Sequence, residues 1–210
     1  MAYNLTGKHE AQWFESEVSR HYKKFSTKEN INIFIGTWNV NAKTPKDNIE
    51  SWIKPKIFGN KKFKPHIYAL GFQEIVDLNA ANLWIENTAN INWEEKIINT
   101  LGGNKSEYIQ IASKHLVGIL LVILVHKSIK KYISNIMSSI CGVGLFGTAG
   151  NKGGVGIRFK VFDSEICFVC AHLAAHKKNV EGRNSDYMKI LENLKFIDKK
   201  QQNNNNNIND

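Results

Sequence analysis

Three polar side chains follow strongly hydrophobic segments of the sequence and have the chemistry to bind a metal ion or a phosphate. They are Asn39, Glu74 and His172. In α/β proteins the ends of strands often meet at one edge of a sheet, where binding sites form. One carboxylate and one carboxamide oxygen suit Mg²⁺, which keeps several waters and takes further ligands from substrate phosphates. Because loops ordinarily begin with polar residues, each residue taken alone also has a purely structural explanation.

A glycine-rich stretch, residues 142–156, lies between the second and third of these positions. It contains a GxGxxG spacing, but a dinucleotide-binding fold requires a helix directly afterwards, and here further glycines and a strand-like segment follow. No Gly-Lys-Ser/Thr occurs in it, which excludes a P-loop. The stretch predicts a loop with positive φ angles or close backbone approach. Lys152 within it is a candidate phosphate contact, with a tight turn and a solvated lysine as the alternative.

Two histidines, His172 and His176, are four residues apart. Zinc proteases place such a pair on a helix with glutamate after the first histidine, whereas Leu173 stands there in this chain and His172 ends a strand. Zinc is therefore disfavoured. We expect histidines that contact phosphate, because an imidazolium donates charge-assisted hydrogen bonds to anions. Two structural histidines are the alternative.

The elements that would position these residues follow from hydrophobic patterns. Segments rich in Ile, Val and Phe predict strands at 31–38, 66–72, 108–112, 116–125, 155–162 and 166–171. Helical spacing of apolar residues predicts helices at 10–25, 79–85, 93–101 and from about residue 184. Mixed strands and helices in this order indicate an α/β (α+β) layered domain at residues 30–200. Residues 1–29 are expected to form a lead-in helix, and the asparagine-rich tail at 201–210 to remain disordered.

The composition indicates an anionic partner. Lys and Arg number 28 against 19 Asp and Glu, which gives a formal net charge of +9. This surplus favours nucleic acid, an acidic membrane surface or a polyphosphorylated molecule without choosing among them. Three cysteines are too few for a disulfide framework, and Cys167 and Cys170 are predicted to point to opposite faces of a strand as buried core residues. The N-terminus lacks the apolar core of a signal peptide, and the longest apolar run is too short to span a membrane.

Five short motifs occur in the order found in the inositol-polyphosphate 5-phosphatases. They are Thr37-Trp38-Asn39-Val40-Asn41, Gly71-Phe72-Gln73-Glu74, Gly150-Asn151-Lys152-Gly153-Gly154-Val155, His172-Leu173-Ala174-Ala175-His176 and Arg183-Asn184-Ser185-Asp186-Tyr187. The chain resembles the type II branch of that family most, from about residue 31 to residue 196. Five motifs in register are far more specific than any one alone.

The resemblance implies a DNase I-like (endonuclease/exonuclease/phosphatase) sandwich of two mixed β-sheets flanked by helices. It also implies Mg²⁺-dependent hydrolysis of the 5-phosphate of phosphoinositides or inositol polyphosphates. Glu74 would hold the metal with support from Asn39, and His172 would be the catalytic contact to the phosphate. The substrate-binding residues would be Asn151, Lys152, His176 and Arg183. Arg183 has a planar donor fork that suits phosphate, but it could equally fix the start of its helix to the sheet.

The family continues with a Gly-Asp-Leu-Asn-Tyr-Arg motif and a Ser-Asp-His motif, and neither occurs in these 210 residues. We therefore expect an N-terminal part of the catalytic domain, with little activity alone and an exposed apolar sheet face. The expected setting is cytoplasmic, with peripheral contact to an anionic membrane, no nucleic-acid partner and an open oligomeric state. A metal-dependent nuclease of the same fold, and a non-catalytic module that binds phosphoinositides or a partner protein through the lysines between residues 54 and 64, are the alternatives.

Overall fold

A computed structural model describes residues 3–54, 64–76, 83–143 and 152–197. The chain divides into two compact units, residues 1–31 and 32–210. The first unit contains helix α1 (Tyr3–His21) and the short 3-10 helix η1 (Tyr22–Lys24), where the sequence predicts a helix at 10–25. All the candidate site residues lie in the second unit. Within the described residues, no helix has the length and apolar character needed to cross a membrane.

The first sheet of the second unit has four strands in the order β1-β2-β4-β3. Strand β1 (Ile33–Asn39) runs parallel to β2 (Ile67–Gln73), and β4 (Ile119–His126) is antiparallel to both β2 and β3 (Tyr108–Leu116). Every residue of β2 is buried. Strand β4 is buried from Ile119 to Val125. These two strands lie at the centre of the sheet, with the second sheet on one face and helices on the other. Their near-continuous apolar sequences fit burial on both faces.

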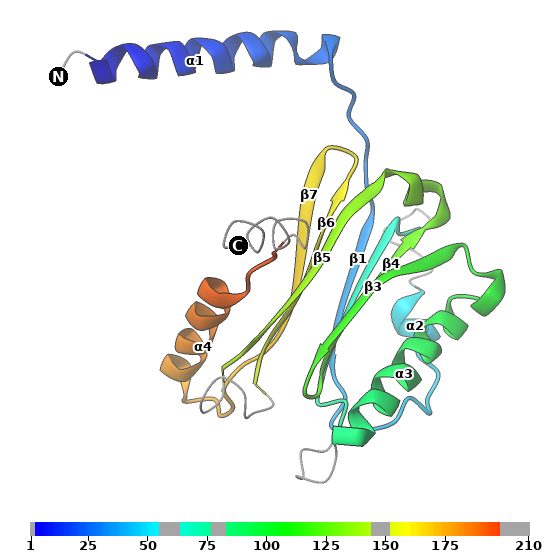
Figure 1. Ribbon diagram of the computed structural model, residues 1–210. Coiled ribbons are helices and arrows are strands. Elements are labelled where there is room, and N and C mark those ends of the chain that lie inside the picture. The colour runs from blue at the N-terminus through cyan, green and yellow to red at the C-terminus, as the bar shows by residue number, and fades with distance from the viewer. Residues whose placement is uncertain (1–2, 55–63, 77–82, 144–151, 198–210) are drawn as a thin grey trace, which may run out of the picture. The chain divides into compact units, whose positions relative to one another are not determined.

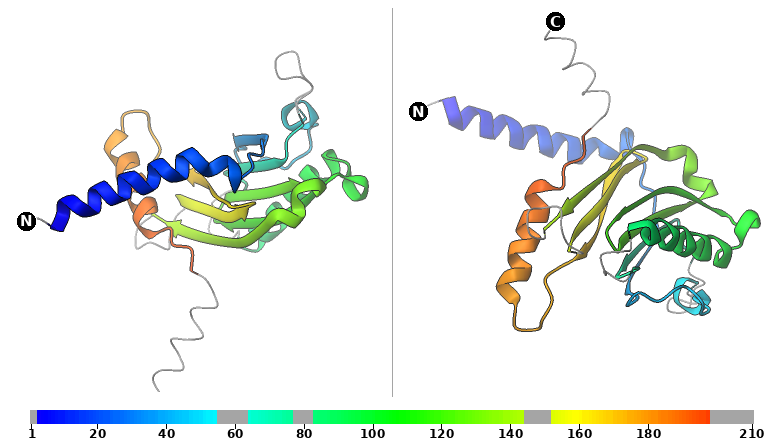
Figure 2. Two further views of the ribbon diagram at one scale, coloured as in Figure 1. Left: turned by 90° about the horizontal axis from the view of Figure 1, so that it is seen from above. Right: turned by 60° about the horizontal axis from the view of Figure 1, so that its bottom comes forward.

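The second sheet has three strands in the order β5-β6-β7. These are β5 (Ile133–Gly142), β6 (Gly153–Val161) and β7 (Ser164–His172), and both pairings are antiparallel. The first sheet is therefore mixed, as predicted, and the second is antiparallel in its described strands. Figures 1 and 2 show the two sheets face to face, with helix α4 (Val180–Asn193) on the outer side of the second sheet.

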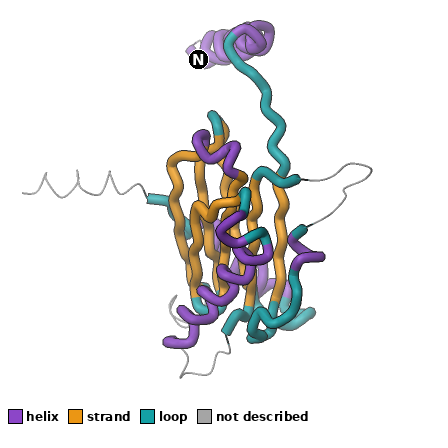
Figure 3. The backbone as a smooth tube through the Cα atoms, turned by 90° about the vertical axis from the view of Figure 1, so that its right-hand side faces the viewer, coloured by secondary structure: helices purple, strands orange, loops and turns teal. Residues whose placement is uncertain are grey.

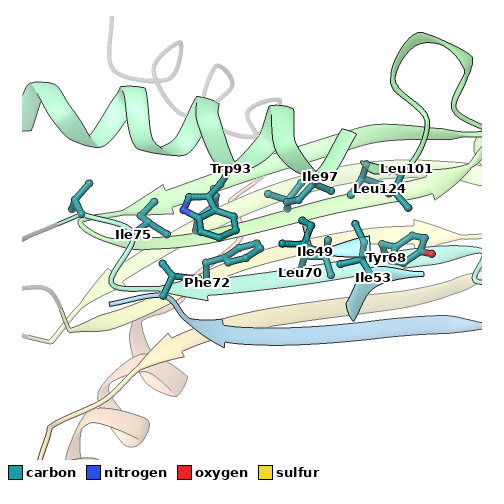
Figure 4. Packing of buried hydrophobic residues seen from close by; sticks show 14 residues of the cluster. Ile49, Ile53, Tyr68, Leu70, Phe72, Ile75, Trp93, Ile97, Leu101 and Leu124 are labelled. Carbon is teal, nitrogen blue, oxygen red and sulfur yellow. The ribbon is translucent and has the colours of Figure 1, made fainter. Parts of the chain in front are cut away.

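Helices α2 (Glu50–Ile53) and α3 (Leu83–Thr100) cover the outer face of the first sheet. Trp93, Ile97 and the adjoining Leu101 pack against Phe72 and Leu124 of the sheet, in a cluster that also holds Ile49 and Ile53 (Figure 4). Figure 3 shows the strands side by side with helices on either side of them. Burial of these large side chains is the main stabilising contribution to the four-stranded layer. The short 3-10 helices η2 (Gly103–Lys105) and η3 (Lys127–Tyr132) connect the remaining elements.

The local patterns missed one strand and divided one helix into two. Strand β5 was not predicted, because its pairing register shifts between Ser134 and Met137 and breaks the alternation of apolar residues along the strand. The two helices expected at 79–85 and 93–101 are one helix over the described residues, since α3 runs without interruption from Leu83 to Thr100. Residues 79–82 of the first expected helix lie outside the described part of the chain.

The cysteine prediction was correct for Cys170, which is buried, and wrong for Cys167, which is exposed. The two side chains do point to opposite faces of β7, but only the inner face is covered by the first sheet. Val169, which lies next to Cys167 on the outer face of β7, is 49% exposed. In the other sheet, Ile35 on β1 is 69% exposed. Apolar side chains are thus exposed on strands of both sheets.

Candidate functional site

The two sheets bring the three predicted strand-end residues to one end of the sandwich. Strands β1 and β2 are parallel and in register, with Asn39 opposite Gln73, so that Asn39 and Glu74 leave the same edge of the first sheet. Strand β7 of the second sheet ends at His172, and its Nε2 lies 3.4 Å from Glu74 Oε1. The carboxylate and the imidazole are therefore neighbours although they come from different sheets.

Glu74 has a backbone conformation that few non-glycine residues adopt. Its φ is +55°, in the left-handed region. The neighbouring chain holds it there, because Glu74 O accepts the amide of Ala42 at 2.6 Å and the next amide, of Ile75, donates to Gly118 O at 3.1 Å. Such a conformation costs of order 1 kcal/mol or more and persists only where its surroundings determine it. The turn aims the carboxylate out of the strand end, where its side chain is 31% exposed.

Asn39 is oriented by the turn that follows it. Its Oδ1 accepts the backbone amide of Asn41 at 3.1 Å, and Asn41 and Ala42 both have positive φ angles. The amide of Val40 donates to Gln73 O at 2.9 Å, which joins this turn to the end of β2. A carboxamide oxygen has two lone pairs, so one remains for a further partner after the bond to Asn41.

Lys152 adds a cation to this cluster. Its Nζ lies 2.5 Å from His172 Nε2. Burial lowers the pKa of Lys152, while the nearby Glu74 and Asp186 carboxylates act to raise it. The pKa of His172 is lowered by burial and by the Lys152 charge, against the opposing effect of Glu74. Nε2 cannot accept a hydrogen bond from Lys152 and donate one to Glu74 at once. The contact with Lys152 is the shorter of the two and fits a hydrogen bond from the ammonium to an unprotonated Nε2, and the lowered pKa of His172 acts in the same direction.

Arg183 and Asp186 of helix α4 hold the segment that follows His172. The Arg183 guanidinium donates to His176 O at 2.6 Å and to Lys177 O at 3.1 Å. Asp186, which is buried, accepts the backbone amide of Ala174 at 2.8 Å. Of the two roles considered for Arg183, the structure favours fixing its helix to the neighbouring chain. The sequence analysis missed Asp186, although its position three residues after Arg183, one helical turn along α4, would have placed both on one face.

His176 lies apart from these contacts in the described structure. It is exposed, with a φ of +73° that places it in a turn, and its backbone oxygen rather than its imidazole makes the bond to Arg183. Asn151, predicted to bind substrate, lies outside the described residues together with residues 144–150 of the glycine-rich loop. At the far end of that loop, Gly153 packs where an added Cβ would meet Cys141 O, so a side chain is excluded there.

The side chains that could ligate a metal here are few. They suit a divalent cation that keeps water ligands better than one whose ligands all come from the protein. Within the described residues no group of three His, Cys, Asp or Glu side chains could hold a metal ion. The cluster offers one carboxylate, Glu74, and one carboxamide, Asn39. This is the set expected for a hard cation that keeps water ligands and binds substrate phosphate, and it is too poor in nitrogen and sulfur for zinc.

A family model described as Endonuclease/Exonuclease/phosphatase family 2 matches residues 36–209. The phosphatidylinositol 4,5-bisphosphate 5-phosphatase INP51 of Saccharomyces cerevisiae is 34% identical over 176 residues, which are 82% of this chain and 19% of that protein. The type II inositol 1,4,5-trisphosphate 5-phosphatase of Mus musculus is 32% identical over 182 residues, which are 86% of this chain and 18% of that protein.

A solved inositol polyphosphate 5-phosphatase domain of SPsynaptojanin, in complex with inositol (1,4)-bisphosphate and calcium ion, superposes with a TM-score of 0.74 at 32% identity. The match covers 88% of this chain and 52% of that one. A Cimex nitrophorin superposes with a TM-score of 0.51 at 11% identity, which shows a shared fold alone. The predicted endonuclease/exonuclease/phosphatase sandwich is thus confirmed. The chain spans about half of the solved domain and less than a fifth of the two curated relatives.

Proposed function

This chain belongs to the endonuclease/exonuclease/phosphatase family and is homologous to its inositol-polyphosphate 5-phosphatases, and on that basis we propose that it forms part of an enzyme that removes the 5-phosphate from phosphoinositides or inositol polyphosphates. The observation that carries the proposal is the cluster of Glu74, His172 and Lys152, which joins strand ends of both sheets. A carboxylate that can bind a metal, beside a lysine and an imidazole that can donate to phosphate oxygens, suits a phosphate ester.

Glu74 and Asn39 are the residues that would hold the cation, and Mg²⁺ is the ion that their oxygen atoms suit best. When bound, the cation supplies Lewis-acid polarisation of the scissile phosphate and neutralises charge on the leaving oxygen. Lys152 would donate to a phosphate oxygen in place of its contact with His172. That exchange would leave His172 Nε2 free to take a proton and become a second donor to the phosphate. His176 is exposed and lies four residues after His172, and it would contact the outer part of an anionic substrate. Asn151 would bind the substrate beside Lys152.

Activation of the attacking water needs a further group. Among the described residues, Glu74 is the one carboxylate of the cluster and is assigned to the metal, and the nearby Asp186 is engaged by the amide of Ala174. We therefore infer that a general base from outside the described residues completes the site, since such a base is typically worth 10²–10⁴-fold in rate. The exposed apolar side chains on β1 and β7 support the same conclusion, because a complete sandwich would cover them.

The formal net charge of +9 supports peripheral association with anionic membranes from the cytoplasmic side, as an extension of this proposal. The same charge would also serve a nuclease, so the experiment includes a DNA substrate.

The test measures binding and turnover with the purified chain. Inositol (1,4)-bisphosphate binding is followed by calorimetry with Mg²⁺ and with EDTA, and phosphate release from inositol 1,4,5-trisphosphate and cleavage of nicked DNA are measured in parallel. We expect binding that depends on Mg²⁺, is lost in Glu74→Gln and is weakened at least tenfold in Lys152→Ala. The matched controls are Glu192→Gln and Lys189→Ala on exposed positions of α4. Binding that ignores Mg²⁺ and Glu74→Gln, or DNA cleavage without inositol phosphate binding, would contradict the proposal.

A further inference from the structure

We propose that Gln73 is the positioning residue of this site: its buried side-chain amide ties together the three strands that end at Asn39, at Gln73 itself, directly before Glu74, and at His172, and thereby sets the affinity for the divalent cation. The inference deepens the function proposed above and rests on its metal site. Gln73 would act through the residues that follow these strands, and would itself touch neither metal nor substrate.

The amide of Gln73 makes hydrogen bonds to both neighbouring strands. Its Nε2 donates to Thr37 Oγ1 of β1 at 3.2 Å and to Cys170 Sγ of β7 at 3.1 Å. Gln73 is only 9% exposed, and it is the last residue of β2. The bond to Thr37 lies within the first sheet, whereas the bond to Cys170 crosses to the second sheet. One side chain therefore connects β1, β2 and β7.

Each strand linked by this amide carries a site residue one or two positions further on. Thr37 precedes Asn39 by two residues, Cys170 precedes His172 by two, and Gln73 directly precedes Glu74. Residues two apart on a strand lie on the same face, so Asn39 and His172 leave the inner face of the sandwich directly beyond the two acceptors. A change in the spacing of the three strands at Gln73 would therefore move the metal ligands and the phosphate-binding imidazole relative to one another.

The chemistry of the two acceptors requires an amide at position 73. A carboxamide has two N–H donors, and here one is directed at a hydroxyl and the other at a sulfur. The Cys170 thiol can accept this bond because its own proton is directed to Phe72 O, at 3.6 Å. Burial raises the pKa of Cys170 to about 11, so that it remains a neutral thiol at physiological pH. Neither a thioether nor a carboxylate at position 73 can supply both donors.

The test compares two substitutions of glutamine by methionine in the same sheet. Gln73→Met keeps the length of the side chain but removes both donors. Gln110→Met removes the bond from Gln110 Nε2 to Glu94 Oε2, 2.7 Å long, on the side of the sheet that faces α3, and is the matched control. The apparent Kd for Mn²⁺ is measured on the whole chain by electron paramagnetic resonance of the free ion, and the free energy of unfolding by urea titration.

Loss of partners behind metal ligands typically weakens metal affinity 10–100-fold, so we expect at least a tenfold rise in the Kd for Gln73→Met and less than a twofold rise for Gln110→Met. Thr37→Val and Thr37→Ser form a second pair at an exposed strand position where neither change threatens folding. The valine should weaken Mn²⁺ binding and the serine, which keeps the hydroxyl, should restore it.

Equal Mn²⁺ affinities in wild type, Gln73→Met and Thr37→Val would overturn the positioning role while leaving the metal site intact. A loss of affinity that is the same for Gln73→Met and Gln110→Met would overturn it as well, because it would reflect stability alone. Absence of Mn²⁺ binding to wild type, or binding that survives Glu74→Gln, would instead refute the proposed metal site and the inference together.

Discussion

Gly71 of β2 lies so close to Cys170 of β7 that a Cβ atom on Gly71 would stand 2.8 Å from Cys170 Sγ and 3.1 Å from its Cβ. This is the point at which the two sheets approach each other immediately behind the candidate site. Gly71 is two residues before Gln73 on the same face of β2. The absence of a side chain at position 71 leaves room for Cys170 of β7, and the amide at position 73 donates a hydrogen bond to its sulfur.

Gly71→Ala should therefore destabilise the protein through overpacking. We expect a loss of about 1–3 kcal/mol in the free energy of unfolding, measured by urea titration. In a Cys170→Ala background the penalty should fall, because the sulfur atom that meets the new methyl group is gone. A penalty of equal size in both backgrounds would show that the strain has another origin.

Asp186→Ala should loosen the segment that follows His172. The partly buried amide of Ala174 would lose its acceptor. An unsatisfied buried donor costs about 1–3 kcal/mol, and we expect a loss toward the lower end of that range. Faster hydrogen exchange at Ala174, measured by NMR, should accompany the loss of unfolding free energy. Glu192→Ala, at an exposed position on the same helix, is the control and should change stability by less than about 0.5 kcal/mol. Unchanged exchange at Ala174 in Asp186→Ala would contradict this role.

His66 should make the protein less stable below neutral pH. Its pKa is lowered by burial first and then by the positive charges of His126 and Lys64, and its Nδ1 accepts the amide of Asn32 at 2.9 Å. Because the folded-state pKa lies below the unfolded value of about 6.5, the unfolded chain binds more protons in that window. The stabilisation is therefore complete above pH 6.5 and is lost as the pH falls through the folded-state pKa.

The measurement is the midpoint of urea unfolding between pH 7.5 and pH 5. His66→Gln should flatten the acid side of this profile relative to wild type. His115→Gln, at an exposed position of β3, is the control and should keep the wild-type slope. A profile that is the same in His66→Gln and wild type would show that this histidine does not contribute.

Alkylation should distinguish the exposed cysteine from the two buried ones. Iodoacetamide at pH 8 is expected to modify Cys167 in the folded protein, and Cys141 and Cys170 only after unfolding. Partial burial raises the pKa of Cys167 despite the nearby Arg158, so its rate of modification should increase with pH as the thiolate forms. Peptide mass spectrometry locates the label. Modification of Cys170 at the rate of Cys167 in the folded chain would contradict the packing of β7 against the first sheet.

The amino-acid sequence by itself determined the composition of the candidate site and most of its scaffold. Six of the seven described strands follow from hydrophobic runs, because a strand that packs in a layered fold must be apolar on at least one face whatever lies beside it. The polar residues after them identified Asn39, Glu74 and His172, since side chains able to bind metal or phosphate are conspicuous beside apolar runs. Strand β5 was not predicted because a register shift breaks the alternation of its apolar residues. The exposure of Cys167 was not predicted because alternation along a strand places side chains on opposite faces without indicating which face is covered.

Only the tertiary structure decided how these residues work together. The contacts of His172 with Lys152 and Glu74, and the lowered pKa of its imidazole, depend on burial and on distances within and between the two sheets. The same is true of Gln73, whose partners are 36 and 97 residues away along the chain. Local patterns report what a segment can bury, whereas hydrogen bonds, charges and pKa values in a site are set by neighbours that the fold alone brings within reach.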